Sequence, residues 1–203
     1  MSDVLRAEGA TVLTAARGEG AELRLDAGDD ASVAEAFARL LGAHGRLDGL
    51  VVAAAPPAHT LDPARNFDPT QALEAVDAKA MAFLRLANAA IPPMRVAGFG
   101  RIVGISGQNA FITGNITGSV RNAALIIAGK NLADELAGTG VSVNVVNPGP
   151  VTADPAAGVA PGRPGESSPE QIADLVAFML SPRSSTSGES IATGHKVRGA
   201  VSL

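Results

Sequence analysis

The sequence contains no cysteine, no tryptophan and no tyrosine among its 203 residues. Without cysteine the chain forms no disulfide and offers no thiolate as a nucleophile or metal ligand, and this composition suits a reducing compartment. Without tyrosine, no phenolic hydroxyl is available for proton transfer. Aromatic residues make up only 3%, so the core must be packed mainly by alanine, valine, leucine and isoleucine.

Long apolar runs and blocks of like charge are also missing. No stretch approaches the about 18 apolar residues that a membrane helix needs, and the N-terminus lacks the layout of a signal peptide. The net charge is −4 and the basic residues are scattered, which argues against a surface for nucleic acid or anionic lipid. We therefore expect a cytoplasmic protein with no nucleic-acid partner, no membrane partner and no metal site.

The residues that are present predict one α/β domain over 1–203. Hydrophobic residues make up 46% and charged residues 18%, which indicates a well-buried core. Short β-branched runs alternate with segments of helical spacing, and this order is typical of a doubly wound parallel sheet with helices on both faces. The expected strands are 10–16, 21–26, 47–55, 100–106 and 141–148, and the expected helices are 30–45, 68–94, 119–140 and 168–181.

Local signals agree with these boundaries. Asp30 and Ser168 are expected N-caps, and Pro169 suits a first helical position. Residues 155–169 are rich in Gly, Pro and Ser, which predicts a flexible surface loop on the substrate side.

Four segments in this order resemble the short-chain dehydrogenase/reductase family. GRLDGLVVAAAP (45–56) is similar to the family's fourth strand and GRIVGISG (100–107) to its fifth. VSVNVVNPGPVTAD (141–154) is similar to the sixth strand and its Pro-Gly turn, and residues 169–194 are similar to the last helix and strand. The resemblance covers essentially the whole chain and implies a Rossmann-like fold, a nicotinamide cofactor, and a homodimer or homotetramer.

The start of the chain departs from the family. Its members open with a strand and a Gly-rich turn that places the cofactor pyrophosphate on a helix N-terminus. Here MSDVLRAEGATV resembles the second half of the first helix and the approach to strand two. Loss of a central strand would leave two strand edges unpaired, so we expect the sequence to be N-terminally truncated relative to the natural chain.

The catalytic positions depart further. By resemblance Ser106 matches the family's catalytic serine, and Asp77 takes the place of its relay asparagine. The Tyr-x-x-x-Lys motif aligns with Gly118 and Asn122. A missing general acid typically costs about 10² to 10⁴ in rate, so the usual mechanism is impaired. His59, which titrates near neutral pH, and Asp77 are the candidate substitutes. Arg121, beside Asn122, is a strong ligand for a carboxylate or phosphate, but its direction on the helix favours a surface or subunit contact.

Cofactor contacts are likewise implied by the resemblance. Arg17 follows the second strand, where an Arg suits the 2′-phosphate of NADP better than the 2′-hydroxyl of NAD. Asp26 matches the adenine contact, and Ala53 stands in the run that replaces the family's Asn-Asn-Ala-Gly.

On the nicotinamide side, Pro148 and Gly149 match the Pro-Gly turn and Thr152 the contact to the nicotinamide amide. NADP is the expected cofactor, with NAD, or none, as alternatives.

Three functions stay open from the sequence. The first is an oxidoreductase acting on the carbonyl or alcohol group of a small molecule through a degenerate site. The second is a lyase, isomerase or cyclase that uses the same scaffold without redox chemistry. The third is a catalytically silent subunit or binding protein.

Overall fold

The computed structural model describes residues 1–54 and 60–199. Its strands are β1 (Ala15–Ala16), β2 (Leu23–Arg24), β3 (Gly49–Val52), β4 (Gly100–Ile105), β5 (Val141–Pro148) and β6 (Ser190–Thr193). Every pairing between them is parallel. Two sheets result, one with the order β1-β2 and one with the order β3-β4-β5-β6.

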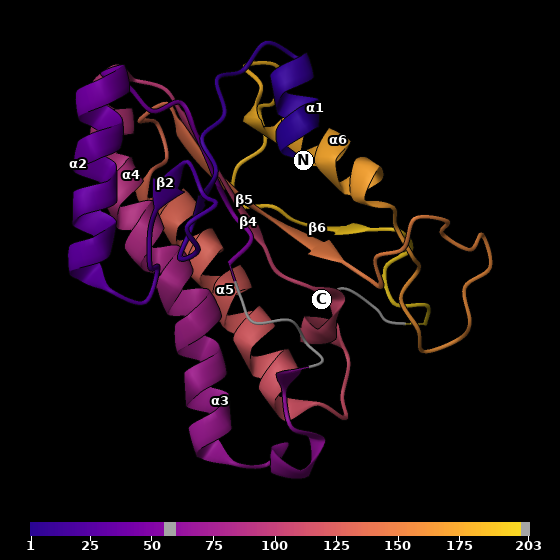
Figure 1. The fold of residues 1–203 in the computed structure, drawn as a ribbon. Coiled ribbons are helices and arrows are strands. Elements are labelled where there is room, and N and C mark those ends of the chain that lie inside the picture. The colour runs from indigo at the N-terminus through magenta and orange to yellow at the C-terminus, as the bar shows by residue number, and fades with distance from the viewer. Residues whose placement is uncertain (55–59, 200–203) are drawn as a thin grey trace.

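Helices cover both faces of the larger sheet (Figure 1). The helices are α1 (Ser2–Ala7), α2 (Asp30–His44), α3 (Pro69–Val76), α4 (Ala82–Ala97), α5 (Ile116–Glu135) and α6 (Pro169–Leu180). Helices α4 and α5 pack on one face, with α2 against α4, while α6 packs on the other face with α1 against it. This confirms the doubly wound parallel α/β fold.

The core consists of two clusters, because side chains along each strand point alternately to the two faces of the sheet. In β4, Ile102 belongs to the cluster under α4 and α5, whereas its neighbour Val103 belongs to the cluster under α6. Both side chains are almost fully buried. Successive strand residues point to opposite faces, so a strand covered on both sides reads as a continuous apolar run, which is why these strands could be found in the sequence.

Several expected boundaries are corrected. The strands expected at 10–16, 21–26 and 47–55 are shorter. The helix at 30–45 is capped by Asp29, whose side chain accepts from the Ala31 N–H at 2.9 Å, and not by Asp30. Ser168 does cap α6, in a reciprocal capping box with Gln171.

The helix expected at 68–94 is three segments instead of one. Between α3 and α4 the chain makes a π-helical turn, η3 (Asp77–Met81), and α4 continues to Ala97 through two internal prolines. A π turn contains an extra residue relative to the α-helix, so it changes which side chains face inward. Helix α5 also begins earlier than expected, at Ile116.

Candidate active site

The carboxyl ends of β3, β4, β5 and β6 lie along one edge, because all four strands are parallel. Open α/β sheets bind their ligands outside this edge. At the end of β4 the chain continues through Ser106 and Gly107 into a short 3-10 turn, η4 (Gln108–Phe111), and then to the start of α5. Three of the buried polar residues, Lys79, Ser106 and Asn122, are linked by hydrogen bonds at this point.

Ser106 joins β4 to α5. Its N–H donates to the carbonyl of Val146 at 2.8 Å, and its Oγ donates to the backbone carbonyl of Asn122 at 3.0 Å. The residue is buried. The hydroxyl of this family-catalytic position therefore connects the strand end to the first turns of α5.

The side chain of Asn122 lies over the next residue, Gly107. A Cβ atom placed on Gly107 would come within 3.1 Å of the Asn122 Nδ2. Asn122 is only 4% exposed, and its Oδ1 finds no hydrogen-bond partner in the described part of the chain. A buried acceptor without a partner is costly, so this oxygen is a candidate ligand contact beside the strand end.

Gly118, where the family's tyrosine would stand, has a local structural role. The Asn115 side chain caps α5 by accepting from the Gly118 N–H at 2.8 Å. A Cβ atom on Gly118 would lie 2.8 Å from the Asn115 Nδ2. A larger residue at 118 would therefore displace the cap, so the cap and a tyrosine compete for the same space.

Lys79 is the residue that sequence reasoning missed. It lies inside the π turn, is 6% exposed, and its Nζ donates to the carbonyl of Ser106 at 3.2 Å. Asp77 instead points outward and pairs with Arg85 at 2.9 Å. The structure thus does not place Asp77 at the strand end, and a lysine flanked by small apolar residues in AKAMA was the available signal.

Arg121 is the second cation at this site. It is 5% exposed, which corrects the expectation of a surface or subunit contact. Burial lowers the pKa of Arg121. Burial, and then repulsion by Arg121, lower the pKa of Lys79 from 10.5 to about 8. Among the described residues no carboxylate forms an ion pair with Lys79, so its amine titrates near physiological pH.

The expected adenosine-side residues lie at neighbouring strand ends. Arg17 directly follows β1 and is exposed, and Asp26 lies just past the end of β2. The Asp26 Oδ1 accepts from the Gly28 N–H at 2.9 Å, and its own N–H donates to the Ser32 Oγ at 2.9 Å. Ala53 follows β3 and is exposed.

On the nicotinamide side, Pro148 ends β5 and Gly149 makes a close crossing. A Cβ atom on Gly149 would lie 2.2 Å from the carbonyl oxygen of Gly165, so only glycine lets these two backbones approach. Thr152 donates its N–H to the Ser167 carbonyl at 3.1 Å and is half-buried. The turn is thus fixed to the segment that leads into α6.

His59 lies outside the described residues. Within 1–54 and 60–199, no three potential metal-ligating side chains come together. No helix in those ranges is both long and apolar enough to cross a bilayer.

Comparison with solved structures reveals many similar folds. A crystal structure of YwfH, an NADPH-dependent reductase involved in bacilysin biosynthesis, is 28% identical over 83% of this chain and 73% of its own, with a TM-score of 0.68. A protein titled ribose-5-phosphate isomerase from Brucella melitensis 16M is 25% identical over 95% and 84%, with a TM-score of 0.81. A putative 3-oxoacyl-reductase from Bacillus thuringiensis, 20% identical over 100% and 92%, shares the fold with a TM-score of 0.79.

Sequence comparison identifies the family. No curated protein matches the chain significantly. The family profile described as Enoyl-(Acyl carrier protein) reductase matches residues 2–194, nearly the whole sequence. With reductases of the same type among its structural neighbours, this chain belongs to the short-chain dehydrogenase/reductase family.

Proposed function

We propose that the protein is an NAD(P)-dependent reductase of a small-molecule carbonyl group in which Lys79 supplies the proton. The observation that carries this proposal is the buried Lys79 amine at the end of β4, with its pKa lowered to about 8. Family membership and the NADPH-dependent neighbour support the reductase class. The same site run in reverse would oxidise an alcohol.

Residues at two places along the strand ends support the proposal of a dinucleotide cofactor. Exposed Arg17 beyond β1 suits a 2′-phosphate, which favours NADP over NAD. The unpartnered Asn122 Oδ1 beside Gly107 suits a ribose hydroxyl. Pro148, Gly149 and Thr152 would line the nicotinamide end. A bound nicotinamide would supply the hydride that converts a carbonyl into an alcohol.

Lys79 can hold and move the proton that the absent tyrosine would have handled. Its Nζ is an ammonium group below about pH 8, and it can give a proton to a carbonyl oxygen that gains negative charge. The amine left behind is neutral and recovers its proton from solvent. A catalytic pKa close to the working pH gives efficient proton transfer, and neighbouring Arg121 favours negative charge on the substrate oxygen.

Two specific observations favour a second candidate, a non-redox isomerase or lyase. A buried amine with a lowered pKa is also a suitable base for removing a proton next to a carbonyl. In addition, the neighbour with a TM-score of 0.81 is titled an isomerase. The remaining alternative, a silent subunit or binding protein, predicts neither reductase turnover nor isomerase or lyase turnover.

A binding and turnover experiment separates these candidates. The chain has no Trp or Tyr, so NADPH fluorescence can be followed against a low protein background. We expect NADPH to bind more tightly than NADH, and Arg17→Ala to remove that preference. We expect oxidation of NADPH with a panel of aldehydes and ketones, falling as the pH rises through about 8. Absence of any NADPH response would overturn the proposal.

The lysines offer a matched control. The sequence has only three, Lys79, Lys130 and Lys196, and Lys130 is exposed on α5 and pairs with Asp134. Lys79→Met should abolish most turnover but leave NADPH binding in place, whereas Lys130→Met should change neither. Equal turnover in Lys79→Met and the parent protein would exclude the assigned proton donor.

A further inference from the structure

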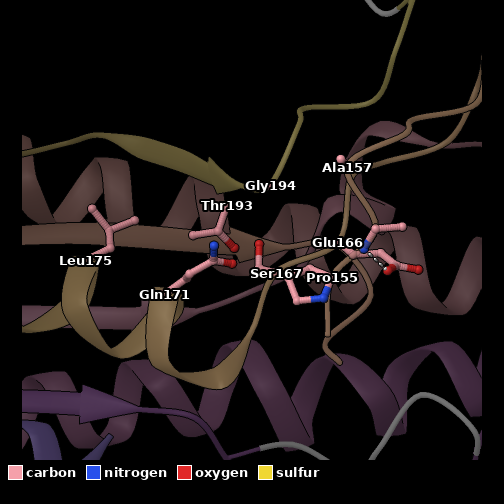
Figure 2. A pocket seen from close by; sticks show the side chains of 9 residues that line it. Pro155, Ala157, Glu166, Ser167, Gln171, Leu175, Thr193 and Gly194 are labelled. Atoms are coloured by element: carbon pink, nitrogen blue, oxygen red, sulfur yellow. Dashed lines mark hydrogen bonds between the residues drawn. The ribbon is translucent and has the colours of Figure 1, made fainter. Parts of the chain in front are cut away.

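A separate pocket of about 430 Å³ lies at the end of β6, between the loop that follows β5 and the first turns of α6. Its lining includes Pro155, Glu166, Ser167, Leu175 and Thr193. Lys79, Ser106 and Asn122 do not line this pocket. Figure 2 shows Ser167, Thr193 and Gln171 turned toward one another, with Glu166 and Pro155 beside them.

Two hydroxyl groups in this pocket are buried without partners. Ser167 is 1% exposed and Thr193 8% exposed. Neither the Ser167 Oγ nor the Thr193 Oγ1 has a hydrogen-bond partner in the described part of the chain. Buried polar side chains in folded proteins nearly always have a partner, so two such groups on one pocket indicate a site that something else completes.

The backbone holds both hydroxyls in place. Ser167 donates its N–H to the Pro150 carbonyl at 3.1 Å and accepts from the Thr152 N–H at 3.1 Å. Thr193 is the last residue of β6 and pairs with Pro148 of β5. Because each residue is anchored through its main chain, the hydroxyls are preorganised and would lose little freedom when a ligand binds.

The other lining residues define the charge and shape of the ligand. Glu166 is the one charged residue in the described lining, and one of its carboxylate oxygens accepts from the Ala156 N–H at 2.8 Å. Gln171 uses its Oε1 in the α6 cap, which leaves the amide N–H groups as donors. Among the described residues Glu166 forms no ion pair, so its carboxylate disfavours an anionic ligand. Leu175 and Pro155 supply apolar walls.

We propose that this pocket binds a small neutral polyol, a compound with several neighbouring hydroxyl groups on a short carbon chain or ring. Each hydroxyl of Ser167 and Thr193 can both donate and accept, as ligand hydroxyls also can. The second oxygen of Glu166 accepts from a third ligand hydroxyl. The carbon skeleton packs on Leu175 and Pro155.

Titration of the full chain with xylitol, followed by backbone amide NMR, tests the proposal. Acetate serves as the anionic comparison. We expect saturable shifts at Ser167, Thr193 and Gly194 with xylitol and none with acetate. Polyols also stabilise proteins by exclusion from their surface, so shifts that rise linearly without saturation, or that spread over the whole surface, would overturn the proposal.

Variants of the two hydroxyls separate binding from folding. Thr193→Val and Ser167→Ala should each weaken xylitol binding about tenfold, the usual effect of one hydrogen bond. Each should also melt at a higher temperature than the parent protein without xylitol. Thr186→Val is the control, because its hydroxyl pairs with Ser184 at 3.0 Å outside the pocket. Unchanged xylitol affinity in Thr193→Val and Ser167→Ala would exclude the site.

Discussion

The ends of β4 and β6 both carry buried polar groups with incomplete pairing, but the groups differ in charge. At β4 the group is the amine of Lys79, whose pKa burial and Arg121 lower to about 8. At β6 the groups are the neutral hydroxyls of Ser167 and Thr193. The free-energy cost of burying the Lys79 amine therefore depends on pH, whereas the cost of burying the two hydroxyls does not. The two sites can be told apart by how each responds to protons and to neutral ligands.

The largest expected effect is on turnover when the amine at β4 is removed. Lys79→Met should lower the rate of carbonyl reduction by about 10² to 10⁴, the usual contribution of a positioned general acid. The fall in rate above about pH 8 should also disappear from the residual activity. Steady-state rates over a pH series measure both effects. A residual rate that keeps the same pH dependence would assign that dependence to another group.

The same substitution should stabilise the fold. A lysine whose pKa falls from 10.5 to about 8 on folding destabilises the folded state by about 3 kcal/mol at neutral pH. Because the folded pKa lies below the unfolded one, this penalty is full below about pH 8 and fades as the pH rises toward 10.5. In urea unfolding, Lys79→Met should raise the free energy of unfolding above that of the parent protein, and by more at pH 7 than at pH 10. An equal gain at both would contradict a buried ammonium.

At β6, Thr193→Val should raise the free energy of unfolding by about 1 to 2 kcal/mol, because it removes a buried hydroxyl without a described partner. The gain should be the same at pH 7 and pH 10, in contrast to Lys79→Met. Thr186→Val, which breaks the pair with Ser184, should give no gain. A pH-dependent gain in Thr193→Val would remove the distinction between the two sites.

The smallest effect concerns the start of α5. Asn115→Ala should lower the free energy of unfolding by about 1 kcal/mol, the usual contribution of an N-cap side chain. In the Asn115→Ala background, Gly118→Ala should raise the free energy of unfolding by up to about 1 kcal/mol, because alanine has the higher helix propensity. With Asn115 present the increase should be smaller, because the alanine Cβ would collide with the Asn115 side chain. A double-mutant cycle measures that coupling. Strict additivity would show that Gly118 does not protect the cap.

The fold was largely predictable from the sequence, whereas the buried position of Lys79 was not. Continuous apolar runs predicted β4 and β5, and Ser168 followed by Pro169 predicted the start of α6. The place of Lys79 was missed because regular α-helical spacing was assumed through residues 68–94, where the chain makes a π turn. The hydrogen bond from the Ser106 hydroxyl to the Asn122 carbonyl could not be predicted either, because it depends on how α5 packs against the end of β4.

The pocket at β6 could not be found from sequence for a related reason. Ser167 and Thr193 are 26 positions apart in the numbering, and nothing local marks their hydroxyls as lacking a partner. That property arises only when the loop after β5 folds back under α6. The contacts to NAD(P) proposed for Arg17 and Asn122 stay predictions.

The π turn at Asp77–Met81 has an evolutionary consequence. A π turn differs from an α-helical turn by a single inserted residue, so deletion of one codon between Asp77 and Met81 would let α3 run into α4 as an uninterrupted helix. The side chains before the deletion would rotate by about 100° relative to those after it. The inward position of Lys79, and with it the chemistry proposed for this protein, thus depends on one extra residue in this turn, so a single-codon deletion would remove it.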